Sequence, residues 1–143
     1  MESLVNKGKI KVKELTISSI KNQIQKVENF IDDIFDEYKI KNEFYGKVSI
    51  SLSEAIKNAI VHGNKSDSSK DVKIRCEFIK NDLKFYVIDG GQGFDFMNYN
   101  KNNISLEDNN DIESQGIFLM KFLSDKIEFE KEGSVVCLYF YVS

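Results

Sequence analysis

The sequence predicts an α+β fold in which helices cover one face of a mainly antiparallel sheet. Apolar residues recur every three or four positions in residues 19–38 and 44–62, which is typical of amphipathic helices. Apolar and polar residues alternate in 72–78, and a second apolar run at 83–89 follows a short turn, which predicts a hairpin. Two further strand-like runs close the chain within 126–142. The resulting order, β-α-α-β-β-loop-α-β-β, favours the α+β class.

The first strand is expected at residues 9–17, where several lysines favour an edge position. Ser18 or Ser19 is expected to cap the first helix. One face of that helix carries the predicted buried stripe, which consists of Ile20, Ile24, Val27, Ile31, Ile34, Phe35 and Tyr38. The second helix is expected to bury Val48, Leu52, Ala55, Ile56 and Ala59.

The second half of the chain contains a long polar loop and a short apolar helix. Residues 95–113 are rich in Asn and acidic residues without a clear period, and a loop of this length in a small domain is more often functional than idle. The segment 114–125 predicts a helix that begins near Gly116, and residues 126–130 and 134–142 predict a closing strand pair.

The composition fits one domain spanning residues 1–143, because 143 residues suffice for one core. The net charge of −3 and the lack of a Lys/Arg block argue against nucleic-acid binding and membrane attraction. No apolar segment approaches ~20 residues and the first ten residues do not resemble a secretion signal, so a cytoplasmic location is expected. Cys76 and Cys137 lie in strand-like runs without metal-ligand spacing, which predicts reduced, buried thiols.

Glu54, Asn58 and His62 are each four positions apart and therefore share one helix face. Such a stripe is either a solvated helix face or part of a site. The predicted hairpin ends in Asp89, followed by glycines at 90, 91 and 93. No P-loop pattern occurs, and the dinucleotide fingerprint is incomplete. A carboxylate that accepts a hydrogen bond from an amino-purine, and helix amides starting at a glycine, outline a purine nucleotide site.

Three segments, in this order and spacing, resemble the N, G1 and G2 boxes of the GHKL ATPase superfamily. These segments are EAIKNAIVHGN (54–64), DGGQGF (89–94) and SQGIFLMKFLSD (114–125). The resemblance spans about residues 45–143 and is closest to the anti-sigma factor serine/threonine kinases. It implies a Bergerat-type two-layer sandwich with an ATP lid at about 97–113.

The resemblance also implies residue roles at the phosphate end of an ATP site. Asn58 matches the asparagine that holds Mg²⁺. Glu54 matches the glutamate expected to act as general base or orienting group for the attacking hydroxyl. Gly116 matches the glycine that lies at the phosphates.

At the adenine end, Asp89 matches the aspartate that reads the base. Gly91 and Gly93 match glycines that let the backbone pack against the nucleotide. Ser134 follows Gly133, where the family often has Gly-Thr, and its hydroxyl could preserve a water-mediated bond near adenine. His62 is interpreted as a structural residue that closes the helix and not as a phospho-acceptor.

In the resembled branch, the γ-phosphate of ATP goes to a Ser/Thr of a STAS-type anti-anti-sigma protein, and the kinase also sequesters a sigma factor as a homodimer. This chain departs from the pattern at Ser114, where the first glycine of the G2 box is expected, and at Gln115, where a basic residue is common. The departure favours an alternative, a non-catalytic or weakly ATP-dependent module that binds a partner. A slow ATPase is the third hypothesis.

Overall fold

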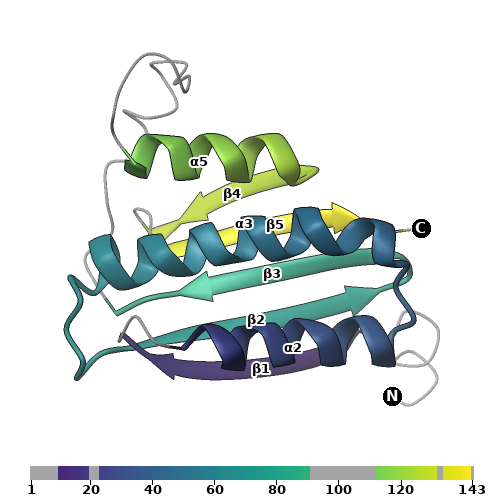
Figure 1. Cartoon of the computed structure of the whole chain (residues 1–143), viewed down its shortest axis with the longest axis horizontal. Coiled ribbons are helices and arrows are strands. Elements are labelled where there is room, and N and C mark those ends of the chain that lie inside the picture. Colours follow the sequence, from purple (N-terminus) through teal and green to yellow (C-terminus); the bar gives the residue numbers. More distant parts are fainter. Residues whose placement is uncertain (1–9, 20–22, 91–111, 132–133, 143) are drawn as a thin grey trace.

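The computed structural model describes residues 10–19, 23–90, 112–131 and 134–142, and these form an antiparallel sheet with helices on one face (Figure 1). The predicted α+β class is therefore confirmed. In chain order the elements are β1 (Lys11–Ser18), α2 (Ile24–Glu37), η1 (Asn42–Phe44), α3 (Tyr45–Asn58), η2 (Ala59–Gly63), β2 (Asp71–Ile79), β3 (Asp82–Ile88), α5 (Ile112–Leu123), β4 (Lys126–Glu130) and β5 (Val135–Tyr141).

The sheet has the strand order β1-β2-β3-β5-β4, and each neighbouring pair is antiparallel. The lysine-bearing strand β1 lies at one edge, as its sequence predicts. A two-residue turn joins β2 to β3 because Ile79 pairs with Asp82. The chain passes from β3 to α5 before β4, and β5 then inserts between β3 and β4.

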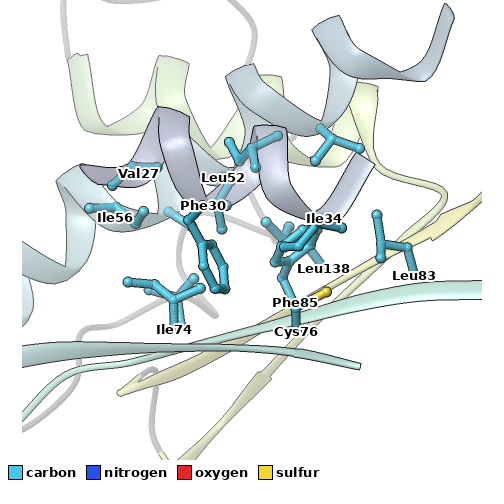
Figure 2. Close-up of a cluster of buried hydrophobic side chains, with 14 of the residues drawn as sticks. Val27, Phe30, Ile34, Leu52, Ile56, Ile74, Cys76, Leu83, Phe85 and Leu138 are labelled. Carbon is cyan, nitrogen blue, oxygen red and sulfur yellow. The ribbon is translucent and has the colours of Figure 1, made fainter. Parts of the chain in front are cut away.

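The core lies between the sheet and the helices (Figure 2). Phe85 and Phe140 come from neighbouring strands and make an edge-to-face contact with ring centroids 6.2 Å apart. Leu52 and Ile34 approach from α3 and α2, and both are fully buried. Apolar side chains at every second strand position therefore meet the apolar stripes of the helices, as the two periodicities predict.

The first helix differs from its prediction at its N-terminal end. α2 begins at Ile24, not at residue 19, and its N-cap residue Gln23 makes no capping hydrogen bond through its side chain. Ser19 is not a helix cap, because its hydroxyl accepts a hydrogen bond from Asn64. Ile24 is 61% exposed, whereas Val27 is 5% exposed, so Ile24 does not belong to the buried stripe as expected, and Ile20 lies outside the described residues.

The opposite face of the sheet is polar and carries pairs between strands. Arg75 on β2 contacts Glu14 on β1 at 3.0 Å and Glu77 at 2.9 Å. Lys84 lies over the rings of Tyr86 and Tyr139, at 4.3 and 4.7 Å from their centroids. Within the described part of the chain, this face carries charge and cation–π contacts, and the helices lie on the other face (Figure 1).

Cys76 and Cys137 are free and buried, as predicted. Burial raises the pKa of both thiols, that of Cys137 to about 12. Among the helices that the structure describes, none has the length and apolar character needed to span a bilayer.

Candidate functional site

Glu54 and Asn58 on α3 converge on α5. Asn58 is 5% exposed, and the Glu54 side chain is 18% exposed, so neither belongs to a freely solvated helix face. A Cβ built on Gly116 of α5 would lie 2.5 Å from Glu54 Oε1 and 3.9 Å from Asn58 Oδ1. The Glu54 carboxylate therefore lies against Gly116, and the side-chain oxygen of Asn58 lies within van der Waals range of the same position.

Gly116 does not begin its helix, which corrects the prediction that α5 starts there. α5 begins at Ile112, so Gly116 lies in its second turn and cannot offer the first free amides of the helix. Its importance is steric instead, because the missing side chain lets the Glu54 carboxylate lie against the helix backbone. Packing of α5 on α3 therefore explains the glycine better than a helix start does.

Asp89 follows β3 and lies beside the end of the second helical segment. Its backbone amide donates a hydrogen bond to the carbonyl of Ser134 at 3.0 Å. A Cβ on Gly63 would overlap both carboxylate oxygens of Asp89, so this glycine leaves the room that the carboxylate occupies. The hydroxyl of Ser134 donates to the carbonyl of Lys131 at 2.9 Å, within the turn between β4 and β5.

The end of α3 widens into a π-turn, η2, which delivers residues to the site. The amide of Asn64 donates to the carbonyl of Ala59 at 2.8 Å, five residues earlier. π-turns are rare and are frequent at functional sites. Here the turn ends the helix with Gly63 against Asp89 and Asn64 against Gly90. His62 lies half-buried within it.

Asn64 is a structural residue of the site that the sequence alone did not indicate. It is fully buried, and its Nδ2 donates to Ser19 Oγ at 2.6 Å and to the Asp71 carbonyl at 3.0 Å. Its Oδ1 accepts a hydrogen bond from the Gly90 amide at 2.7 Å. One amide therefore ties the ends of β1 and β3 and the start of β2 to the end of α3. The signal for it was weak: an Asn after Gly63 fits an ordinary helix end.

Several predicted residues lie outside the described part of the chain. These are Gly91, Gly93 and the predicted lid up to residue 111, whereas residues 112 and 113, also predicted for the lid, begin α5. The side chain of Ser114 is not described either, whereas Gln115 is half-buried on α5. The departures in the G2 box therefore remain sequence observations.

The described site residues gather at one end of the molecule, on the left in Figure 1, where α3 and β3 end and α5 begins. Glu54 and Asn58 offer a carboxylate and an amide oxygen, which are the hard ligands that Mg²⁺ prefers. Asn58 Oδ1 is therefore a suitable ligand for such an ion, whereas Glu54 Oε1 lies 3.4 Å from the ammonium of Lys57. Among the described residues, no group of three or more His, Cys, Asp or Glu forms a metal site of its own. An ion here would therefore take its remaining ligands from phosphates and water.

Comparison with known protein families gives a match over most of the sequence. The sequence pattern described as histidine kinase-like ATPase domain matches residues 17–140. No curated protein matches the chain. The crystal structure of the RsbU and RsbW domains of Rv1364c from Mycobacterium tuberculosis is similar, with a TM-score of 0.64 and 15% sequence identity. The match covers 92% of this chain but 32% of that one.

Proposed function

Because the chain belongs to the histidine kinase-like ATPase family, we propose that it binds Mg·ATP and transfers the γ-phosphate to a serine or threonine of a STAS-type anti-anti-sigma protein. The observation that carries the proposal is the convergence of Glu54 and Asn58 on Gly116. A buried amide and a half-buried carboxylate at one spot suit the phosphate end of a nucleotide. Positioning and charge stabilisation supply most of the catalysis in phosphoryl transfer, so few residues are needed.

At the adenine end, the Asp89 carboxylate accepts a hydrogen bond from the amino group of the base. Gly63 leaves the space in which this carboxylate lies, and the Ser134 carbonyl holds the Asp89 backbone. Gly91 and Gly93 follow directly and provide close approach of the backbone to the nucleotide. The hydroxyl of Ser134 lies one residue from β5 and is assigned to a water-mediated contact near the base.

At the phosphate end, Asn58 would hold Mg²⁺ through its side-chain oxygen. The ion would supply positive charge that offsets the charge of the phosphates. The acceptor hydroxyl oxygen forms a bond to the γ-phosphorus while the bond from that phosphorus to the bridging oxygen breaks, and ADP leaves. Glu54 takes the hydroxyl proton, or orients the hydroxyl by accepting its hydrogen bond.

The proposed kinase function also implies partner proteins, an oligomeric state and a cellular location. We assign a STAS-type protein as the phosphate acceptor, a sigma factor as a second partner, and a homodimer in the cytoplasm as the working form. The similar structure contains an RsbU and an RsbW domain of one protein of Mycobacterium tuberculosis.

The test is transfer of labelled phosphate from Mg·ATP to a STAS-type protein, with phosphoserine or phosphothreonine mapped by mass spectrometry. Glu54→Gln keeps the shape of the side chain but removes the proton acceptor. It is expected to keep ATP binding and to lower transfer at least tenfold. The matched control is Glu43→Gln on η1, an exposed site, which should leave transfer unchanged. Unchanged transfer in Glu54→Gln would remove Glu54 as the base.

A second candidate, a partner-binding module without transfer, is favoured by Gln115 in place of a basic residue. It predicts a stable complex with the partner and no phosphorylated residue in the same assay. A slow ATPase predicts ADP release in the absence of any partner. The three hypotheses therefore give three different products from one set of mixtures.

A further inference from the structure

A pocket opens between α2 and α3, and we propose that it receives an aliphatic side chain of the acceptor protein's phosphorylated segment. This inference rests on the proposed kinase function. The pocket has a volume of about 410 Å³, within the range of ligand pockets. Six of its ten lining residues are aliphatic, and these are Ile17, Ile24, Val27, Ile56, Ile60 and Val61.

The pocket has a buried floor and an exposed apolar lip. Ile17, Ile56 and Ile60 are between 2% and 6% exposed and belong to the core. Ile24, in the first turn of α2, is 61% exposed although it continues the apolar stripe of the helix. A single exposed isoleucine is ordinary, but one at the mouth of an apolar pocket gains burial when a partner covers it.

The pocket is continuous with the phosphate end of the proposed site through Glu54. This residue lines the pocket, and its Oε1 also lies against the Gly116 position on α5. A hydroxyl that reaches Glu54 for proton transfer therefore comes from a segment that passes next to the pocket. This shared residue identifies the occupant as the acceptor segment and separates it from an unrelated ligand.

The spacing along α3 and the following η2 sets the expected sequence of that segment. Ile60 and Val61 lie six and seven residues after Glu54, which is roughly 10 Å at 1.5 Å per helical residue. An extended segment covers this distance in about three residues at roughly 3.3 Å each. The pocket thus fits a leucine-sized or isoleucine-sized side chain two or three positions from the phosphorylated serine or threonine.

The charged residues on the rim of the pocket set a second requirement for the sequence of the acceptor segment. Lys57 lines the pocket between the two ends of this path, and its side chain is 49% exposed. Its ammonium lies 3.4 Å from Glu54 Oε1, so opposite charges already adjoin each other on this path and neither sign of partner charge is favoured. The residues between the hydroxyl and the aliphatic anchor are therefore neutral.

Two variants change the pocket without touching the nucleotide residues. Ser53→Phe fills it from α3, and Ile24→Ser removes the apolar lip. The matched control is Val12→Ser, an aliphatic residue that is 41% exposed on β1 and pairs with Glu77 on β2. Each variant is tested for its Mg·ATP-induced melting shift and for kcat and KM in transfer to a STAS-type protein.

We expect both pocket variants to raise the KM for the protein acceptor at least tenfold, with the ATP shift and kcat unchanged and the control like wild type. Replacing the aliphatic residue two or three positions from the mapped phosphosite with Asp should raise KM as much, and adding Ser53→Phe should then raise it no further. This non-additivity distinguishes direct contact from a general loss of structure.

Other outcomes overturn the inference. If wild type transfers phosphate and the pocket variants keep its KM, the pocket is not the acceptor's, and the proposed function stands. If a pocket variant loses the melting shift caused by Mg·ATP, the pocket supports the fold instead. If a variant changes only self-association, measured by light scattering, the pocket binds a second copy of this chain instead. If wild type phosphorylates no STAS-type protein while binding Mg·ATP, the proposed function fails, and the inference fails with it.

Discussion

Replacing Asn64 with alanine should both destabilise the protein and weaken ATP binding, because one buried amide joins three chain segments. The variant removes hydrogen bonds of 2.6, 3.0 and 2.7 Å and leaves the partners on Ser19, Asp71 and Gly90 unsatisfied. At about 1 kcal/mol for each bond, the expected loss is about 3 kcal/mol of unfolding free energy. For a chain of this size that lowers Tm by roughly 10 °C.

The effect on ATP comes from one of the three bonds. Gly90 follows the proposed adenine acceptor Asp89, and its amide donates to Asn64 Oδ1. Without this acceptor the segment after β3 loses its attachment to the end of α3, so ATP affinity should fall at least tenfold. Ser19→Ala is the matched control, because it removes one bond of the same amide without touching Gly90. It should cost about 1 kcal/mol and leave ATP affinity near wild type.

Urea unfolding measures the first effect, and calorimetric titration with Mg·ATP at low temperature, where the variant remains folded, measures the second. An Asn64→Ala protein with the unfolding free energy of wild type would refute the stability argument. Equal loss of ATP affinity in Ser19→Ala would show that Gly90 is not the link to the nucleotide.

Three further predictions concern separate parts of the molecule. Gly63→Ala places a Cβ on the Asp89 carboxylate and should lower ATP affinity at least tenfold by calorimetry, whereas Gly46→Ala, with open space at its Cβ, should not. The Tyr45 hydroxyl donates a hydrogen bond to Asp32 at 2.6 Å, which raises the pKa of Tyr45 to about 12. The neutral phenol is therefore favoured in the folded state. Below pH 10, Tyr45→Phe should have a free energy of unfolding about 1 kcal/mol lower than that of wild type, measured by urea unfolding at a series of pH values. This difference in unfolding free energy should vanish as the pH rises to about 12. Cys76 and Cys137 should not react with a thiol reagent at about pH 8 in the folded protein, because burial raises the pKa of both thiols. Both should react in denaturant. Fast reaction of the native protein would contradict their burial.

The elements could be predicted because their apolar periods differ. The alternation of Val72, Ile74 and Cys76 in β2 and the helical spacing of Leu52, Ala55 and Ile56 in α3 both match the buried faces observed. Helix ends were less predictable. Ser19 has the chemistry of a helix cap, but its hydroxyl bonds to Asn64, and the choice depends on a residue 45 positions away.

The site could be predicted only where its residues lie on one element. Glu54 and Asn58 share a helix face by their spacing alone, and the structure adds their contact with Gly116 on α5. The role of Asn64 depends on three segments that are distant in the chain, so no local pattern indicates it. The pocket at Ile24 was hidden for a similar reason, since periodicity gives the direction of a side chain but not whether another element covers it.

The central claim is that the ends of α3 and β3 and the start of α5 form an Mg·ATP site that includes Asp89. Its most direct test is the melting temperature of wild type and Asp89→Asn with ATP or GTP, each with and without magnesium. At an ATP concentration of about 100 times Kd, wild type should gain about 2.7 kcal/mol, or roughly 8 °C. The gain should require magnesium, and GTP and the Asp89→Asn variant should show none. No shift with Mg·ATP in wild type, or an equal shift in Asp89→Asn, would contradict the claim.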